Sequence, residues 1–249
     1  MLGQLRKLSV RPEALVIRSY RGPELYSQTL GSAIEEKFQY PHLLVHRADI
    51  RRILYDEANA AGADVHFNTC VQTLDPTTGT ISVVGGKRYS ADLIIGADGE
   101  HSFCRETLLQ RKDAPQSSGD VVFRLAVPSA LIEADSSVSG LIEQPMVHAW
   151  YGPNSHAVCY QLKKGGIFNI VLTLPEEPGA VTIGPQIADI EFIRKSCALW
   201  DPKFRRLLQL ADRALKWTLL ETQELSHWST PSGKLILIGD SAHASLPYL

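Results

Sequence analysis

The clearest periodic pattern in the chain covers residues 48–61, with the sequence ADIRRILYDEANAA. Its apolar positions recur at intervals of three and four residues and fall on one helical face: Ile50, Ile53, Leu54, Ala58 and Ala61. Gly62 follows directly, and glycine is the residue that most often ends a helix. We therefore expect an amphipathic helix over residues 48–61.

Shorter apolar runs on either side of this helix predict strands. Residues 13–20, with the Arg-Gly-Pro turn after them, indicate a hairpin at the edge of a sheet. Residues 64–74 and 80–84 indicate two further strands, separated by the turn sequence DPTTG. The run DLII at residues 92–95 is short and almost wholly apolar, which is typical of a strand buried on both faces of a parallel sheet. Residues 46–110 therefore have an α/β pattern.

The middle of the chain has a different pattern. Four β-prone runs follow one another and are separated by Gly, Pro, Asn and Ser: residues 121–127, 146–151, 156–162 and 167–174. No helical pattern lies between the last three runs, so an antiparallel sheet is the simplest interpretation.

The last part of the chain returns to the earlier pattern. We expect two helices, near residues 186–199 and 202–215, and the second carries apolar residues on one face as far as Leu215. The run KLILI at residues 234–238 is another short buried strand. The coarse architecture is an α/β portion, then an antiparallel insert, then a return to α/β.

Composition and charge exclude several classes of protein. The chain has 249 residues, 44% hydrophobic and 21% charged, which is close to the average for globular proteins. The chain has 25 basic and 27 acidic residues, so its net charge is −2 and gives no reason to expect nucleic acid as a partner. The longest stretch without charged side chains, residues 144–162, contains two prolines and several polar residues, so we expect no membrane segment.

The four cysteines, Cys70, Cys104, Cys159 and Cys197, are widely spaced and form no Cys-x-x-Cys pair. The N-terminal residues lack the apolar region of a signal peptide. We therefore expect reduced thiols and a cytoplasmic protein. The eight histidines are scattered along the chain, so we expect no metal site.

Two Gly-Asp turns follow apolar strands and carry side chains with useful chemistry. The first is GADGEHSFCR at residues 96–105, where Asp98 offers a carboxylate to sugar hydroxyls and Arg105 offers a guanidinium to a phosphate. The second is GDSAH at residues 239–243. The simpler interpretation of either one alone is an ordinary turn after a strand. Two such turns about 140 residues apart make coincidence a weaker explanation.

A third segment, HRAD at residues 46–49, opens the predicted amphipathic helix. Its Arg47 taken alone would be read as a solvated arginine. A hydrolase is a poor interpretation of Ser241, because the Gly-x-Ser-x-His sequence around it lacks the second glycine of a nucleophile elbow.

Taken together, the three segments resemble the class A FAD-dependent monooxygenases, the aromatic hydroxylases related to salicylate and p-hydroxybenzoate hydroxylase. The resemblance covers nearly the whole chain and rests on HRADI, ADLIIGADGEHSFCRETL and GKLILIGDSAHASLPYL. It implies the FAD-binding fold of that family, with a parallel-sheet portion and an antiparallel substrate-domain sheet. The corresponding domain ranges are residues 1–120, 121–185 and 186–249.

The resemblance also implies a reaction and the residues that serve it. Such enzymes use NAD(P)H to reduce FAD and O₂ to hydroxylate or epoxidise a small aromatic or related secondary metabolite. The positions matching Arg47, Asp98, Asp240 and Pro247 serve the cofactor.

Two strand residues match positions treated as catalytic in some fungal relatives. The resemblance makes Arg124 the anchor of an acidic or phenolate substrate and Tyr160 the group that orients its hydroxyl. A structural salt bridge and a core aromatic are the competing explanations of these two residues.

One part of the family pattern is missing. No Gly-x-Gly-x-x-Gly sequence occurs in the chain, and the glycine-rich helix that the family has after the position of Pro247 is absent. We therefore interpret the chain as such an enzyme truncated at both ends, so that its fold is incomplete. We expect it to bind FAD poorly on its own and to expose Leu93, Ile94, Leu237 and Ile238. The alternative is a non-catalytic truncated product or a degenerate interaction module.

Overall fold

The computed structural model describes residues 1–177 and 184–247, which form two compact units. Unit 1 comprises Met1–Ala63 and Gly119–Thr218, and unit 2 comprises Asp64–Ser118 and Leu219–Leu249. Each unit thus combines two segments that are distant in the sequence. In the described ranges no helix is long and apolar enough to cross a membrane.

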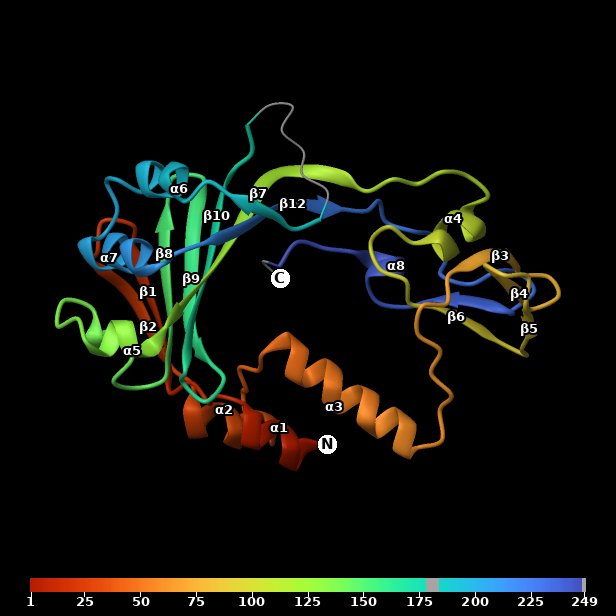
Figure 1. Cartoon of the computed structure of the whole chain (residues 1–249), viewed down its shortest axis with the longest axis horizontal. Coiled ribbons are helices and arrows are strands. Elements are labelled where there is room, and N and C mark those ends of the chain that lie inside the picture. The colour runs from red at the N-terminus through yellow and green to blue at the C-terminus, as the bar shows by residue number, and fades with distance from the viewer. Residues whose placement is uncertain (178–183, 248–249) are drawn as a thin grey trace. The chain divides into compact units, whose positions relative to one another are not determined.

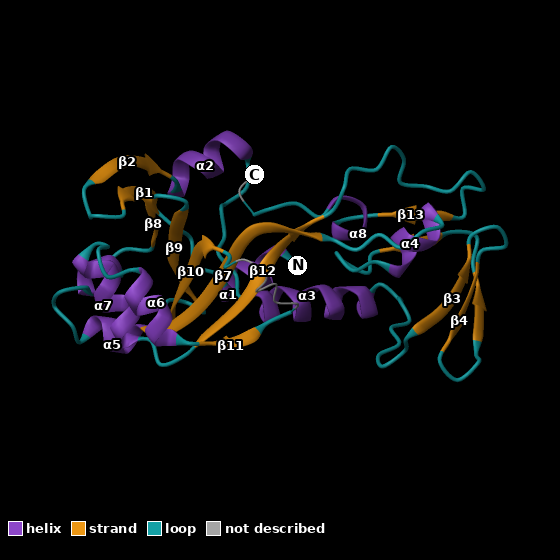
Figure 2. Ribbon diagram, turned by 90° about the horizontal axis from the view of Figure 1, so that it is seen from above, coloured by secondary structure: helices purple, strands orange, loops and turns teal. Residues whose placement is uncertain are grey.

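Unit 1 is built on an eight-stranded sheet with the order β11-β12-β7-β10-β9-β8-β1-β2 (Figures 1 and 2). Its strands are β1 (Ala14–Ser19), β2 (Glu24–Thr29), β7 (Gln116–Pro128), β8 (Met146–Gly152), β9 (Ser155–Leu162), β10 (Ile167–Pro175), β11 (Gln186–Ala188) and β12 (Ala214–Glu221). The antiparallel order predicted for the middle of the chain is confirmed for β7, β10, β9 and β8. The edge hairpin β1–β2 is also confirmed, and β1 joins the sheet by pairing with β8 in parallel.

Alternation along the strands gives this sheet two different faces. On β10, Phe168, Ile170 and Leu172 are fully buried in the main core of unit 1. Figure 2 shows the helices α5 (Ser129–Glu133), α6 (Ile190–Ser196) and α7 (Pro202–Leu210) gathered on one side of the sheet. Apolar side chains of α6 and α7, such as Ile193 and Phe204, belong to the same core. These three helices therefore do not cover the opposite face of the sheet.

Buried polar residues connect α7 to the sheet. Asp201 caps α7 by accepting a hydrogen bond from the backbone N–H of Lys203 at 2.9 Å. Its second carboxylate oxygen accepts a hydrogen bond from the indole Nε1 of Trp150 at 2.8 Å. Trp150 is fully buried on β8, so this contact fixes the start of α7 against the middle of the core.

His148 is a second buried polar residue on the core face of β8. Arg18 donates a hydrogen bond to its Nδ1 at 3.0 Å, and its Nε2 donates one to the carbonyl oxygen of Leu141 at 2.8 Å. This pair of contacts requires the neutral imidazole with its proton on Nε2. Burial, helped by the positive charges of Arg18 and Lys203, lowers the pKa of His148 to about 4.

We expect this histidine to make stability depend on pH. Between pH 6.5 and about 4 the unfolded chain binds a proton that folded His148 does not bind. The free energy of unfolding therefore falls as pH is lowered through this window, by at most about 1.4 kcal/mol per pH unit. Urea denaturation of wild type and His148→Gln at pH 7 and pH 5 measures the effect. The variant should lose less stability than wild type on acidification, whereas the exposed control His42→Gln should match wild type; equal losses in all three proteins would contradict the prediction.

The remaining helices of unit 1 lie in its N-terminal segment. They are α1 (Leu2–Leu8), α2 (Gly31–Phe38) and α3 (Arg47–Ala60), and a short 3-10 turn, η1, covers Ser139–Leu141. The helix predicted over residues 48–61 is thus confirmed. Ile53 is its buried residue, but Leu54 is 51% exposed, so the apolar face is narrower than the periodicity indicates.

Two other expectations are wrong in detail. The strand predicted over residues 64–74 is observed only from Val71 onward, as β3 (Val71–Asp75). The predicted helices 186–199 and 202–215 are shorter, because residues at their outer ends pair with each other as β11 and β12. Leu215, expected on the helix, lies opposite Ile187 in this ladder, so sheet pairing overrides the continued helical periodicity.

In its described residues, unit 2 contains two small sheets and two helices. β6 (Ile94–Gly96) and β13 (Leu235–Leu237) form a parallel pair, as the two short apolar runs predict. β3, β4 (Thr80–Val83) and β5 (Arg88–Ser90) form an antiparallel sheet. The helices are α4 (Phe103–Leu109) and α8 (Asp240–His243).

The exposure expected for the parallel pair is correct for only part of its residues. Leu93 is 48% and Ile238 is 47% exposed, as expected. Leu237 is fully buried and Ile94 is partly buried, because both pack in a small core with residues of α4 and α8 such as Leu108 and Ala242. The two helices thus cover one face of the strand pair.

Candidate functional site

A cavity of about 550 Å³ lies in unit 1 on the sheet face opposite the main core. Its lining residues come from the start of α3, from β7, β9, β10, β11 and β12, and from the segments just before α3 and β12. They are Val45, His46, Arg47, Arg124, Leu125, Ala126, Tyr160, Leu162, Ile167, Asn169, Ile187, Arg213, Ala214 and Leu215. The wall is mostly apolar with a few polar groups, the usual composition of a small-molecule site.

Strand register explains why these side chains meet. Asn169 on β10 lies opposite Ala126 on β7 and opposite Tyr160 on β9, so the three residues form one row across the sheet. Arg124 precedes Ala126 by two residues and therefore points to the same face. Arg47 reaches the cavity as the first residue of α3, which His46 caps by accepting the backbone N–H of Ala48 at 3.3 Å. The fold thus brings together three of the residues singled out from the sequence: Arg47, Arg124 and Tyr160.

The cavity carries positive charge without a matching negative one. Arg47, Arg124 and Arg213 all line it, and no Asp or Glu of the described part of the chain does. None of the three arginines has a carboxylate partner among the described residues. A half-enclosed apolar site with unpaired guanidinium groups favours a flat anionic ligand.

Among the polar lining residues, sequence reasoning missed Asn169 and Arg213. Asn169 had a signal, because it is a polar residue inside the apolar run IFNIVLTL at residues 167–174. Arg213 had none, because it fell inside a predicted helix that in fact ends at Leu210.

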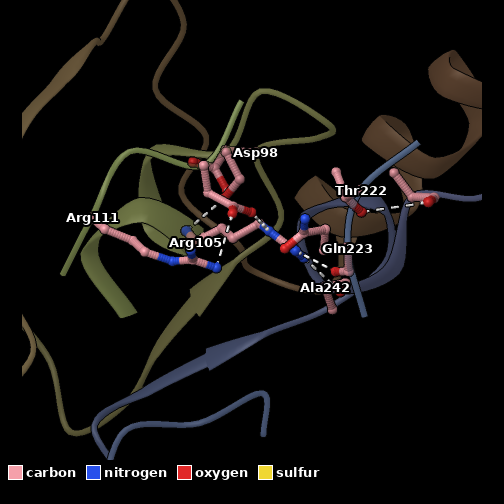
Figure 3. Close-up of polar contacts among 9 residues, drawn as sticks. Asp98, Arg105, Arg111, Thr222, Gln223 and Ala242 are labelled. Carbon is pink, nitrogen blue, oxygen red and sulfur yellow. Dashed lines mark hydrogen bonds and ion pairs between the residues drawn. The ribbon is translucent and has the colours of Figure 1, made fainter. Parts of the chain in front are cut away.

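Asp98 holds the loop between β6 and α4 in unit 2 (Figure 3). One of its carboxylate oxygens accepts a hydrogen bond from the Ser102 hydroxyl at 2.5 Å, and the other accepts the backbone N–H of Cys104 at 3.0 Å. The Ser102 hydroxyl in turn caps α4 by accepting the N–H of Arg105 at 2.8 Å. Asp98 therefore orders the loop, and only its remaining lone pairs are left for a ligand.

Arg105 does not reach toward a ligand, in contrast to the expectation from its motif. It is 1% exposed, and its Nε donates to Asp113 at 2.5 Å. Its other two nitrogens donate to the backbone carbonyl oxygens of Ala242, at 2.9 Å, and of Gln223 (Figure 3). The guanidinium thus ties α4 to two segments that lie more than 100 residues further along the chain.

Close packing brings the two Gly-Asp turns to the same edge of the parallel pair. A Cβ on Gly96 would come within 2.6 Å of the Cβ of Cys104, so only glycine allows α4 to approach β6 this closely. Gly239 has φ 59 and ψ −143, a conformation that favours glycine and turns the chain from β13 directly into α8. Since Leu237 lies opposite Gly96 in a parallel register, Asp98 and Asp240 both follow the carboxyl ends of their strands.

Neither nearby nucleophile is available for covalent chemistry. The Ser241 hydroxyl is buried and donates to the carbonyl oxygens of Gly96 and Ile238, at 2.6 and 2.7 Å. Burial, followed by the charge of Asp98, raises the pKa of Cys104 to about 12. Both groups are structural, which removes the hydrolase interpretation of Ser241.

The chemistry of this edge fits the sugar-alcohol chain of a flavin. Asp240 is exposed, and its carboxylate has no partner among the described residues, so it is free to accept hydrogen bonds from hydroxyl groups. Pro247 is also exposed. The cofactor residues expected from the sequence therefore occupy two places: Asp98, Asp240 and Pro247 in unit 2, and Arg47 in unit 1.

Comparison with known proteins identifies the class. The family model described as FAD binding domain matches residues 20–166, which is more than half of the chain, so the chain belongs to this family. Within it, the chain is similar to the class A FAD-dependent aromatic monooxygenases, as the names of its relatives show. The expected fold is confirmed: it is the α/β fold of the p-hydroxybenzoate hydroxylase-like enzymes.

Alignments with similar proteins include all or nearly all of this chain but only part of each relative. The FAD-dependent monooxygenase OpS4 of Beauveria bassiana is 30% identical over 254 residues, 100% of this chain and 59% of its own. The 3-amino-4-hydroxybenzoate 2-monooxygenase PtnB3 of Streptomyces platensis is 32% identical over 100% of this chain and 61% of its own. The crystal structure of CtdE in complex with FAD and substrate 4 has the same fold, with a TM-score of 0.85 and 18% identity over 98% of this chain and 61% of its own. The chain thus spans about 60% of the relatives it matches.

Proposed function

We propose that the whole protein is an FAD- and NAD(P)H-dependent monooxygenase that hydroxylates a small anionic aromatic compound. The observation that carries this proposal is the cavity of unit 1, where three arginines without carboxylate partners stand among apolar walls. The name of PtnB3 specifies an aromatic acid as its substrate, which agrees with a ligand of this charge and shape.

The side chains of the cavity have different roles in binding the substrate. Arg124 binds the carboxylate or phenolate, because a guanidinium forms two parallel hydrogen bonds with such a group. Tyr160, which lies opposite Asn169 on the neighbouring strand β9, orients the ring hydroxyl through its own phenol group. Leu162 and Ile167 exclude water around the ring. When bound, FAD reduced by NAD(P)H supplies the activation of O₂.

The cofactor residues follow from the same proposal. Asp240 accepts hydrogen bonds from the ribityl hydroxyls, and Asp98 keeps the adjoining loop in place for the cofactor. We assign Arg47 and Pro247 to the cofactor as well, on the strength of the family motifs that contain them.

Binding of 4-hydroxybenzoate to the 249-residue chain tests the cavity without the cofactor, since all its lining residues belong to unit 1. We expect Arg124→Leu to weaken this binding about tenfold to a hundredfold, the effect of losing a hydrogen bond to a charged group. Isothermal titration calorimetry measures the affinities. The control Arg205→Leu changes an exposed arginine on α7, at the opposite face of the sheet, and should leave the affinity unchanged.

Two results would contradict the proposal. If wild type and Arg124→Leu bind equally, Arg124 is not the anion-binding group. If the whole protein, supplied with FAD, NAD(P)H and a series of aromatic acids, consumes O₂ without forming a hydroxylated product, the reaction is wrong.

A further inference from the structure

We propose that Asn169 orients the substrate: its side-chain amide donates a hydrogen bond to a ring oxygen of the aromatic ligand held by Arg124. This inference rests on the proposed function, because it takes the cavity as the substrate site. It adds a residue that selects among aromatic acids by their ring substituents.

The first observation is an unsatisfied buried donor. Asn169 is 3% exposed, and its Nδ2 has no hydrogen-bond partner in residues 1–177 and 184–247. The described residues contain two other buried side-chain atoms of this kind, Arg11 Nε and Ser129 Oγ, and neither residue lines the cavity. An amide without a partner destabilises the folded protein, because it has lost its hydrogen bonds to water. A role in ligand binding explains why an asparagine occupies this position despite the cost in stability.

The second observation is the position of the amide in the cavity. Asn169 stands in the middle of its row, between Ala126 and Tyr160, and directly opposite residues on neighbouring strands have Cβ atoms about 4.5–5.5 Å apart. Ala126 is small, so it leaves space beside the amide. The nearest lining residue along β10 is Ile167, whose side chain has no hydrogen-bond acceptor.

The third observation is the kind of groups around the amide. Arg124 is a donor only and cannot satisfy Nδ2. Tyr160 carries an acceptor oxygen, but Nδ2 makes no hydrogen bond with it. An oxygen on an aromatic ring bound by Arg124 supplies the acceptor that Nδ2 lacks. The cavity then recognises two points of the ligand: its anionic group by Arg124 and a ring oxygen by Asn169.

The experiment compares two ligands that differ by one hydroxyl group, 4-hydroxybenzoate and benzoate. Their affinities for the 249-residue chain are measured by calorimetry in wild type and in Asn169→Leu. We expect wild type to bind 4-hydroxybenzoate about tenfold more tightly, the effect of one hydrogen bond to a buried group. Asn169→Leu should lose most of this preference and keep only what the Tyr160 hydroxyl contributes, with an affinity for benzoate close to that of wild type.

Stability gives a second readout that a structural role would move in the opposite direction. Because the amide has no partner in the protein, Asn169→Leu should unfold at the same urea concentration as wild type or a higher one. Asn169→Ala is a second variant that cannot block the cavity, and it should also lose most of the preference for 4-hydroxybenzoate. The control Thr173→Val alters a buried polar residue on the same face of β10 that does not line the cavity, and it should keep the preference.

The outcomes separate this inference from the proposed function. If wild type binds neither ligand, the aromatic-acid site itself is wrong. If wild type prefers 4-hydroxybenzoate and both Asn169 variants keep that preference, the site stands and Asn169 does not orient the ligand. A marked loss of stability in Asn169→Leu with unchanged ligand preference would show a structural role and overturn the inference.

Discussion

Replacing Arg105 by methionine is expected to lower the free energy of unfolding of unit 2 by about 3–5 kcal/mol, the cost of breaking a buried ion pair by removing one partner. Asp113, which is only 10% exposed, would lose its partner at 2.5 Å. The carbonyl oxygens of Gln223 and Ala242 would lose their donors as well (Figure 3). Methionine fills part of the volume, so most of the loss reflects the unpaired polar groups.

Arg111→Met is the matched control, because Arg111 contacts the other oxygen of Asp113 at 3.5 Å but is 59% exposed. An exposed ion pair contributes about 0–1 kcal/mol, so this variant should remain close to wild type. Hydrogen exchange measured by mass spectrometry on peptides covering residues 94–109 and 235–243 reports the stability of unit 2 separately from that of unit 1. Equal protection in the two variants would show that the buried arginine is not the connecting group.

Trp150→Ala is expected to destabilise unit 1 by about 3–5 kcal/mol, the range for truncating a buried aromatic residue. Trp150 is fully buried, contacts Phe204 with ring centroids 5.3 Å apart and lies beneath the guanidinium of Arg18 at 5.4 Å. The substitution also removes a hydrogen-bond donor to Asp201, which is 6% exposed. The expected value therefore lies toward the upper end of the range.

The neighbouring residue on β8 provides the control for this prediction. Tyr151 points to the other face of the strand and is 49% exposed. Tyr151→Ala should cost no more than about 1 kcal/mol. Urea denaturation followed by circular dichroism measures both variants, and a difference between them of less than about 1 kcal/mol would contradict the assignment of Trp150 to the centre of the core.

Local patterns predicted much of the fold. The spacing of Ile50 and Ile53 with Gly62 predicted α3, and β-prone runs separated by turn residues predicted the four strands β7 to β10. These predictions succeeded because each depends on the residue types within one element and at its ends, and the sequence displays those directly. The continuation of a helix to Leu215 failed because pairing with Ile187 is a contact between distant residues.

The candidate site was predicted in a similarly uneven way. Arg47 was found through a family motif, and Arg124 and Tyr160 through matching positions in relatives; the structure places all three at one cavity. Arg105 was misjudged because its partners lie 8, 118 and 137 residues away. Arg213 was missed because it lies in the short link between a helix and a strand that the periodicity did not separate.

The sequence by itself determined the elements and the family, because periodicity and the strand-Gly-Asp motifs are local properties of consecutive residues. The tertiary structure alone decided what the polar side chains do. It buried Arg105 as a connecting group, left Asn169 without a partner, and collected three arginines around one cavity without a carboxylate. The physical reason is that hydrogen bonding and charge balance depend on which distant segments meet, and no local pattern records that.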